Sequence, residues 1–218
     1  MDLFDDLPPA TDAMPTQLAP GALLLPGFAH AEAAGLLQAI ESVLQQAPLR
    51  HWQTPGGYTM SVAMSNCGAL GWVSNPAGYR YTECDPLTAK PWPAMPACLL
   101  DLAQRAAAQA GYPQFVPDAC LINLYVPGAK MSLHQDKDEL DLSAPIVSLS
   151  LGLPAVFLFG TPCRKDRPQR YRLAHGDVVV WGGPSRLAYH GVAVLADGDH
   201  ALLGRRRISL TFRCVVKK

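Results

Sequence analysis

Three residues in the second half of the chain have the types and spacing of a metal site. His134 and Asp136 are two positions apart, and His190 lies 56 positions after His134, at the end of a predicted strand over 187–189. Side chains two apart on a strand face the same side, so the imidazole and the carboxylate of His134 and Asp136 would converge. Two histidines and one carboxylate are the ligand set of non-haem Fe(II) oxygenases, which keep open positions for dioxygen and a cosubstrate. His175 is an alternative third ligand, and the His-x-Asp triplet alone also fits a surface pair at a strand end.

A second polar pattern lies near the C-terminus. Four polar residues alternate with apolar ones and would share one face of a strand: Arg207, Ser209, Thr211 and Arg213. Arginine pairs bidentately with carboxylates, and an inward row with two guanidinium groups requires anions to neutralise it. The row therefore suits an organic dicarboxylate, to which Asn123 and Tyr125, two apart on another predicted strand, would donate hydrogen bonds. The alternative is an edge strand whose polar row faces solvent.

The remaining sequence predicts the elements that would position these residues. A strand is expected over 22–25, helical apolar spacing predicts a helix over 31–46, and Pro96 and Gly111 bound a second helix over 97–110. Residues 51–96, rich in Gly, Pro and aromatic residues, suit short strands and ordered loops. From about residue 115, short β-type runs follow one another without helices, which predicts a jelly roll or a sandwich. These runs are 120–125, 146–151, 155–159, 178–181 and 208–212.

The predicted fold class is mostly β, of the α+β kind. A loose N-terminal arm is expected over residues 1–19, an α+β segment over 20–114 and an all-β segment over 115–218. The chain has 218 residues, of which 49% are hydrophobic and 17% charged, so it can form a core and is not a disordered polymer.

Composition also bears on the location of the protein. There is no apolar run of about 18 residues or more, so no membrane span is expected. The acidic N-terminus does not resemble a signal peptide, and a cytoplasmic location is predicted. The six cysteines are scattered without a Cys-x-x-Cys pair, which predicts reduced thiols rather than disulfides or a structural zinc site.

The net charge of zero hides an uneven distribution. Residues 1–49 contain six acidic residues and no Lys or Arg, whereas residues 160–218 contain twelve basic and four acidic residues. The basic residues concentrate at 164–172 and at 205–207. Clusters of this size can contact several phosphates, although a solvated hairpin loop and a charged tail are the alternative interpretation.

Taken together, five segments resemble the AlkB family of Fe(II)- and 2-oxoglutarate-dependent nucleic-acid dealkylases. The segments occur in the family's order, and the resemblance extends from about residue 20 to the end of the chain. They are Pro55–Met64, Pro117–Tyr125, Leu133–Glu139, Gly176–Gly183 and Arg207–Arg213.

The resemblance implies a double-stranded β-helix, or jelly roll, as the catalytic core, covered by an N-terminal nucleotide-recognition lid. It implies that His134, Asp136 and His190 bind Fe(II). It also implies the residues that hold 2-oxoglutarate: Asn123, Leu124, Tyr125, Arg207, Ser209, Thr211 and Arg213. One departure stands out, because the family pattern has Asn where this chain has Ser209, whose side chain reaches less far.

The resemblance extends to the substrate pocket. It implies that the base and its backbone are contacted by Met64, Trp72, Tyr79, Tyr81, Asp138 and Arg164. A flipped base stacks on aromatic side chains, and a base that carries a positive charge from N-methylation gains further from their faces. The aromatic residues would otherwise fill a small subdomain core.

The implied reaction is the oxidative demethylation of 1-methyladenine and 3-methylcytosine in DNA, preferably single-stranded, with RNA as a further substrate. It would consume O2 and 2-oxoglutarate and release formaldehyde, succinate and CO2. One alternative is a 2-oxoglutarate-dependent hydroxylase of a protein or small molecule, which would not need Trp72, Tyr79 and Arg164 together. Another is a non-catalytic nucleic-acid binder, against which the complete ligand set argues. A monomer is expected.

Overall fold

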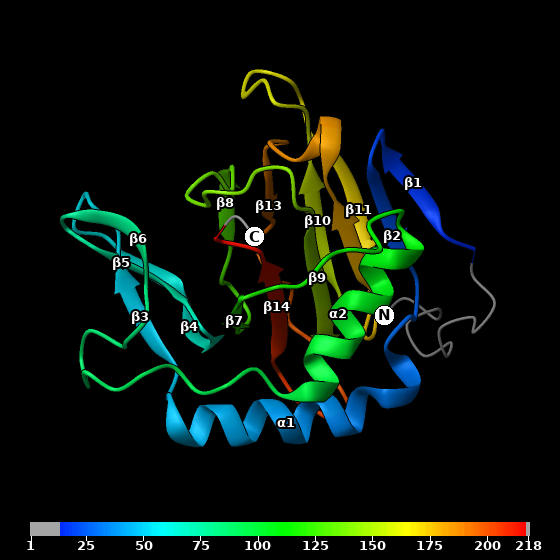
Figure 1. Cartoon of the computed structure of the whole chain (residues 1–218). Coiled ribbons are helices and arrows are strands. Elements are labelled where there is room, and N and C mark those ends of the chain that lie inside the picture. Colours follow the sequence, from blue (N-terminus) through cyan, green and yellow to red (C-terminus); the bar gives the residue numbers. More distant parts are fainter. Residues whose placement is uncertain (1–13, 217–218) are drawn as a thin grey trace.

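A computed structural model of the chain describes residues 14–216 (Figure 1). Within this range the chain forms fourteen β-strands, two α-helices and two 3₁₀ segments, His30–Glu32 and Gly183–Ser185. The strands make up sheets of eight, four and two strands. No helix in the described range is long and apolar enough to cross a membrane. Of the arm predicted over 1–19, residues 1–13 lie outside the described residues and Thr16–Ala19 form a strand.

The eight-stranded sheet, the major sheet, has the order β1-β2-β12-β9-β14-β7-β4-β3. Its strands are β1 (Thr16–Ala19), β2 (Ala22–Leu25), β3 (Arg50–Gln53), β4 (Thr59–Gly68), β7 (Ala119–Tyr125), β9 (Ile146–Gly152), β12 (Val178–Trp181) and β14 (Arg207–Arg213). Neighbouring strands are antiparallel throughout. Strands from both halves of the chain thus share one sheet, with β2 beside β12 and β4 beside β7.

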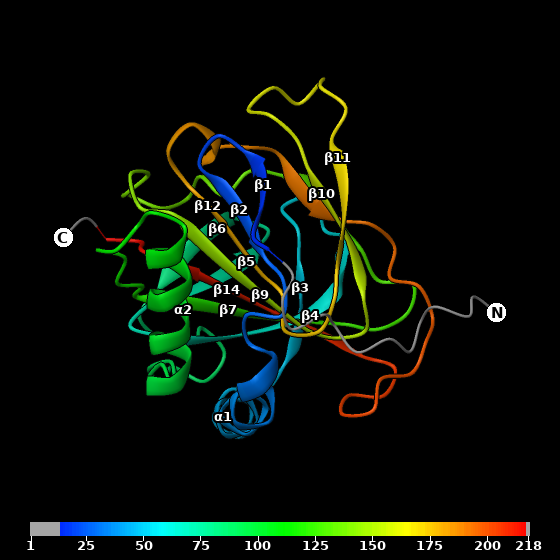
Figure 2. The same ribbon diagram turned by 90° about the vertical axis from the view of Figure 1, so that its right-hand side faces the viewer.

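The four-stranded sheet, the minor sheet, has the order β11-β10-β13-β8 and is also antiparallel. Its strands are β8 (Met131–His134), β10 (Ala155–Phe159), β11 (Gln169–Leu173) and β13 (His190–Val192). The two sheets pack face to face: the rings of Phe157 and Phe159 on β10 lie 6.0 and 6.1 Å from that of Trp181 on β12. This arrangement, seen from the side in Figure 2, confirms the predicted jelly roll.

The two α-helices cover the other face of the major sheet (Figures 1 and 2). Leu36 and Ile40 of α1 (Ala33–Gln46) and Leu102 of α2 (Ala97–Gln109) belong to one buried cluster with the sheet. The predicted stop of the second helix is confirmed, because Gly111 adopts φ +91° and its N–H bonds back to Ala108.

Strand β14 lies between β9 and β7, and all seven of its residues are buried. Ile208, Leu210 and Phe212 join the helix-side cluster, so the alternating polar residues face the space between the two sheets. The interpretation of this row as a solvent-facing edge strand is therefore wrong. Four polar side chains with little access to water form the floor of the interior: Arg207, Ser209, Thr211 and Arg213.

A separate hairpin, β5 (Gly71–Asn75) and β6 (Gly78–Thr82), stands beside the sheets at the place predicted for the lid (Figure 1). The loop after β6 is tied to β3 by a bidentate ion pair, in which Arg50 donates to both carboxylate oxygens of Asp85 at 2.6 and 2.8 Å. The loop that follows the hairpin is thereby joined to the major sheet.

Candidate metal centre and active site

The structure brings the three predicted metal ligands together. The ligand atoms of His134, Asp136 and His190 all lie within 4.8 Å of one another. His134 ends β8, Asp136 follows in the loop after it, and His190 begins β13 directly opposite His134. The strand expected over 187–189 is wrong: this stretch continues the turn that begins with the 3₁₀ segment, and Ala188 N–H bonds back to Ser185.

The tautomers of the two imidazoles suit metal binding. Nδ1 of His134 lies 2.9 Å from the carbonyl oxygen of Ser132, and Nδ1 of His190 lies 3.0 Å from that of Ala188. A carbonyl only accepts, so each Nδ1 carries the hydrogen and each Nε2 keeps its lone pair. Both Nε2 atoms point at Asp136, at 3.6 and 3.7 Å from its two oxygens. Such a second contact at Nδ1 is the usual support of a metal-bound histidine.

Arg213 stabilises the ionised carboxylate of Asp136. Nε and Nη2 of Arg213 donate to Oδ2 of Asp136 at 2.9 and 2.7 Å. Burial raises the pKa of Asp136, but attraction by Arg213 and the two histidines lowers it more, so the pKa lies well below its usual range. Burial lowers the pKa of His190 to about 4. At neutral pH the cluster thus offers one carboxylate and a neutral His190 imidazole, as a divalent cation requires.

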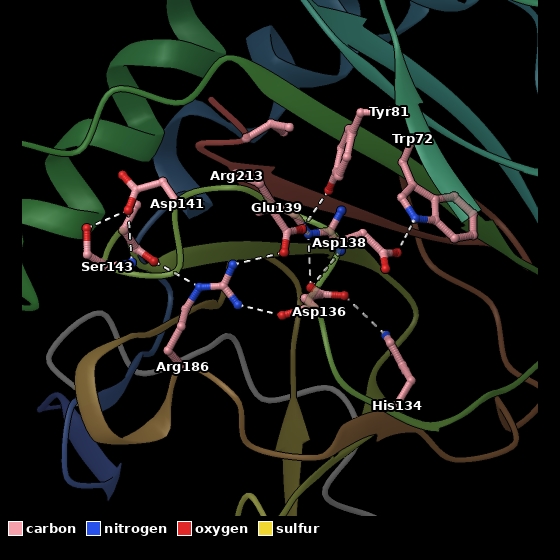
Figure 3. A network of polar contacts seen from close by, with 12 residues as sticks. Trp72, Tyr81, His134, Asp136, Asp138, Glu139, Asp141, Ser143, Arg186 and Arg213 are labelled. Carbon is pink, nitrogen blue, oxygen red and sulfur yellow. Dashed lines mark hydrogen bonds and ion pairs between the residues drawn. The ribbon is translucent and has the colours of Figure 1, made fainter. Parts of the chain in front are cut away.

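A buried network extends from this carboxylate to the β5–β6 hairpin (Figure 3). Glu139 accepts from Tyr81 OH on β6 at 2.6 Å and from Arg186 Nη2 at 3.0 Å, and it lies 3.3 Å from Arg213. Arg186 also donates to the backbone carbonyl of Asp136 at 2.6 Å. The metal-ligand segment is therefore fastened both to the loop before His190 and to the β5–β6 hairpin.

The alternative ligand His175 lies elsewhere. Its ring packs against those of His200 and His30, with centroids 4.5 and 5.6 Å away, in a cluster at the loop ends of the jelly roll. Nδ1 of His175 accepts the backbone N–H of Gly152 at 2.9 Å. Among the described residues, the metal-binding group does not include it.

Beside the metal ligands, the polar face of β14 presents an uncompensated cation. Arg207 is 1% exposed, its Nε donates to Ser150 Oγ at 3.0 Å, and its guanidinium lies 4.9 Å from the ring centre of Tyr125. Burial lowers its pKa, and no carboxylate in the described chain pairs with it. Nη1 of Arg207 and Nε1 of Trp181 are buried donors without a partner among the described atoms. Two such donors fit an anionic cosubstrate.

Of the other predicted cosubstrate residues, all but Leu124 lie on the same side of the major sheet as this arginine. Asn123 is opposite Ser209 in the sheet register, and its buried Oδ1 has no partner in the described range. The Ser209 hydroxyl lies 3.4 Å from that of Ser148, and Thr211 is opposite Ser148. Leu124 faces the other way and packs against the helix-side cluster.

The residues predicted to contact the substrate lie on several elements. The rings of Trp72 and Tyr79 stack with centroids 5.3 Å apart, and Trp72 Nε1 donates to Asp138 at 3.2 Å (Figure 3). Met64 is buried on β4 opposite Asn123. Arg164 is exposed in the β10–β11 loop, with its guanidinium 5.6 Å from the ring centre of Tyr189.

Two contributors to the site carry no local signal in the sequence. Ser150 accepts from Arg207 and Arg186 donates to the carbonyl oxygen of Asp136, in each case between distant segments. Trp181 falls inside a segment that carries the resemblance, and its buried Nε1 has no partner among the described atoms. Glu139 falls inside a segment that carries the resemblance, but nothing local predicts its burial. Its partners Arg186 and Tyr81 are 47 and 58 residues away.

Comparison with known proteins supports one family. The model of the 2OG-Fe(II) oxygenase superfamily matches residues 21–213. The alpha-ketoglutarate-dependent dioxygenase AlkB of Escherichia coli is 57% identical over 218 residues, covering 100% of this chain and 99% of that protein. The AlkB homolog of Caulobacter vibrioides is 45% identical over 203 residues, covering 92% of this chain and 90% of the relative.

A solved structure leads to the same conclusion. The structure of OsALKBH1 superposes with a TM-score of 0.79 at 28% identity, covering 92% of this chain and 100% of that one. A 2OG-Fe(II) oxygenase family protein from Burkholderia pseudomallei, at 18% identity and a TM-score of 0.56, shares the fold. The chain belongs to the 2OG-Fe(II) oxygenase superfamily and, within it, to the AlkB family of dioxygenases that use Fe(II), 2-oxoglutarate and O2.

Proposed function

We propose that this dioxygenase demethylates 1-methyladenine and 3-methylcytosine in nucleic acid, with single-stranded DNA preferred and RNA as a second polymer. The reaction is direct reversal of alkylation damage. One observation carries the proposal: two histidines and a carboxylate meet beside an unpaired buried arginine, beneath a lid with stacked aromatic rings.

Fe(II) would be held by Nε2 of His134, Nε2 of His190 and a carboxylate oxygen of Asp136. When bound, iron and 2-oxoglutarate supply O2 activation, in which the cosubstrate becomes succinate and CO2 and the substrate methyl group is hydroxylated. Arg213 keeps Asp136 ionised and leaves its Oδ1 for the metal, since both hydrogen bonds from Arg213 to that carboxylate end on Oδ2. The hydroxymethylated base then loses formaldehyde by itself and needs no protein nucleophile.

The two arginines of β14 would have different tasks. Arg213 is already engaged by Asp136 and Glu139, whereas Arg207 retains a free Nη1. Arg207 would therefore bind the carboxylate of 2-oxoglutarate that is distant from the metal, with Tyr125 against its guanidinium.

Asn123, Ser209 and Thr211 line the same floor. Asn123 Oδ1 has no partner in the described chain, and because it only accepts, a water rather than 2-oxoglutarate would donate to it.

The lid would select the base. Trp72 and Tyr79 offer an aromatic face to a flipped, positively charged base. One carboxylate oxygen of Asp138 accepts from Trp72, which leaves the other to accept from the exocyclic amine of adenine or cytosine. Arg164, at the rim, would contact a phosphate. Methylation at the pairing edge unpairs the base and lowers the cost of flipping it.

The proposal includes a monomer that acts in the cytoplasm, where it would encounter its substrates. The six cysteines are all free, although Cys67 and Cys120 are opposite each other on β4 and β7. Two thiols that remain free at directly opposed positions fit a reducing compartment. Light scattering of the purified protein would give the mass of one chain, 23.4 kDa, if it is a monomer.

Mass spectrometry of a 1-methyladenine oligonucleotide tests the proposed activity. Incubation with enzyme, Fe(II), 2-oxoglutarate and ascorbate is expected to lower the mass by one CH2 and to release formaldehyde. His134→Ala should abolish the change. If methylated oligonucleotides stay intact while peptides or amino acids gain an oxygen, the enzyme is a hydroxylase of another substrate class.

A further inference from the structure

We propose that Tyr81 is a positioning residue of the metal centre, which acts through Glu139 to keep Arg213 on the metal ligand Asp136. The family resemblance places Tyr81 among the residues that contact the base, and this inference gives its hydroxyl a different task. The hairpin that carries the stacked rings thereby influences the affinity for Fe(II). The inference rests on the proposed metal ligands but not on the identity of the substrate.

The hydroxyl of Tyr81 begins a chain of three polar contacts that ends at the metal ligand (Figure 3). It donates to Oε1 of Glu139 at 2.6 Å. Nε of Arg213 lies 3.3 Å from that same Oε1 and donates to Oδ2 of Asp136 at 2.9 Å. Burial raises the pKa of Tyr81 well above its usual value, so the hydroxyl keeps its proton and can donate. The chain therefore extends without a gap from β6 to Asp136.

Nε of Arg213 carries a single hydrogen, and two carboxylate oxygens lie within reach of it. Oδ2 of Asp136 is the nearer, at 2.9 Å, and Oε1 of Glu139 lies at 3.3 Å. The side chain of Glu139 is 1% exposed, so water cannot replace the donor that Tyr81 supplies. Without that donor, Oε1 would draw Arg213 towards Glu139 and away from Asp136.

The rest of the network leaves this one contact as a neutral adjustment. Oε2 of Glu139 accepts from Nη2 of Arg186 at 3.0 Å. Two arginines and two carboxylates are buried together here, and their charges balance before a metal binds: Arg186, Arg213, Asp136 and Glu139. Removal of the Tyr81 hydroxyl therefore changes the direction of hydrogen bonds and not the net charge.

One face of the hairpin carries both this contact and the stacked rings. Trp72 and Tyr81 are directly opposite each other on β5 and β6, and Tyr79 is two residues before Tyr81. Side chains at such positions project from the same face. Trp72 Nε1 donates to Asp138 at 3.2 Å, next to the contact of Tyr81 with Glu139. The face that would stack on the base is thus joined at two consecutive residues to the segment that follows the metal ligand.

Anaerobic dialysis against Fe(II) alone measures the effect on the metal. Tyr81→Phe keeps the ring and removes the hydroxyl, and the affinity for iron should fall about 10-fold, as is usual for the outer partners of metal ligands. Tyr112→Phe is the matched control, because its hydroxyl donates at 3.0 Å to the carbonyl oxygen of Gly21, outside this network. It should change the affinity by less than about twofold.

The two possible failures can be told apart. Equal iron affinity of Tyr81→Phe and the wild-type chain overturns the proposal. Failure of the wild-type chain itself to bind iron would contradict the proposed metal ligands, on which the inference depends.

A double variant shows whether Tyr81 acts through Glu139. Glu139→Gln keeps the shape of the side chain and one acceptor oxygen but loses the charge, so it should weaken iron binding by itself. Tyr81→Phe/Glu139→Gln should then bind iron no more weakly than Glu139→Gln, because contacts within one network are not additive. Losses that multiply would overturn the proposal. If the Gln chain does not fold, the comparison of Tyr81→Phe with Tyr112→Phe decides.

Oligonucleotide binding without metal separates this role from a contact to the base. Fluorescence anisotropy compares the metal-free wild-type chain and Tyr81→Phe on a 1-methyladenine oligonucleotide. A positioning role predicts that the affinity for iron falls by a larger factor than the affinity for the oligonucleotide. The reverse order would identify Tyr81 as a base contact and overturn the proposal. If the wild-type chain binds iron but no methylated oligonucleotide, the proposed substrate is wrong and the iron measurements stand.

Discussion

The protein contains two groups of neighbouring histidines, and only one of them is built to hold a metal. The rings of His134 and His190 have centroids 4.4 Å apart, and those of His175 and His200 have centroids 4.5 Å apart. Ring proximity is therefore nearly the same in both places. The difference lies in the partners of Nδ1 and in one carboxylate, that of Asp136, which lies near both Nε2 atoms of the first group.

At the metal centre, Nδ1 faces a backbone carbonyl and must donate, which frees Nε2 for a metal. At the loop ends, Nδ1 of His175 accepts the N–H of Gly152, and Nδ1 of His200 accepts that of Leu202 at 3.2 Å. Each Nε2 there carries the hydrogen and has no lone pair to offer. Among the described residues, the only group that could hold a metal is the one that contains Asp136, whose charge is stabilised by Arg213. His175 and His200 belong to no such group. Backbone partners thus decide which histidines can act as ligands.

The largest expected effect comes from Asp136→Asn. The amide keeps the shape of the side chain, but it removes the negative charge that balances both the metal and Arg213. Loss of a support around a metal ligand costs about 10- to 100-fold, and loss of a ligand should exceed this, on the order of 10³-fold in demethylation rate. The matched variant His175→Ala should change that rate by less than about twofold. Comparable losses in the two variants would erase the distinction between the groups.

The two arginines of β14 are expected to differ in their effect on the free energy of unfolding. Arg213→Met leaves Asp136 and Glu139 buried without their cation, which is expected to lower the free energy of unfolding by about 3–5 kcal/mol. Arg207→Met removes a buried charge that has no carboxylate partner. The free energy of unfolding in the absence of cosubstrate should therefore be unchanged or higher. Urea unfolding of the iron-free protein measures both. A large loss in the Arg207 variant would mean that its charge is compensated.

Arg186→Lys tests whether the metal ligands depend on their backbone ties. Lysine retains the charge but cannot donate at once to Asp136, Glu139 and the carbonyl of Ala144, as Arg186 does. Iron affinity should fall about 10- to 100-fold. Arg105→Lys is the matched control, because Arg105 also contacts two carboxylates, on the exposed surface. Equal iron affinity in both variants would show that Arg186 only fills space.

The smallest expected effect is the acid response of the loop-end group. Burial, with repulsion from His200 and His30, lowers the pKa of His175 to about 4, whereas an unfolded histidine titrates near about 6.5. Between these values the unfolded chain binds the proton and the native chain does not, so stability falls as pH drops through this window. His175→Asn should make the free energy of unfolding less dependent on pH between about 7 and about 5. Identical pH dependence would show that His175 titrates normally in the native state.

The sequence predicts what depends on local periodicity. A period of two along residues 207–213 predicted the polar face of β14, and the His-x-Asp spacing predicted the convergence of His134 with Asp136. It could not exclude His175 as a ligand, because its competing hydrogen bond comes from Gly152, 23 residues away. The role of Arg186 could not be predicted for the same reason, because its contacts join segments more than 40 residues apart. The strand expected before His190 was wrong because a 3₁₀ turn carries the chain there.

Anaerobic Fe(II) dialysis tests the central claim most directly. The wild-type chain and His175→Ala should each bind one ferrous ion, and His134→Ala should bind none at the same free-iron concentration. Retention of the ion by His134→Ala, or its loss from His175→Ala, would contradict the assignment of the metal to His134, Asp136 and His190.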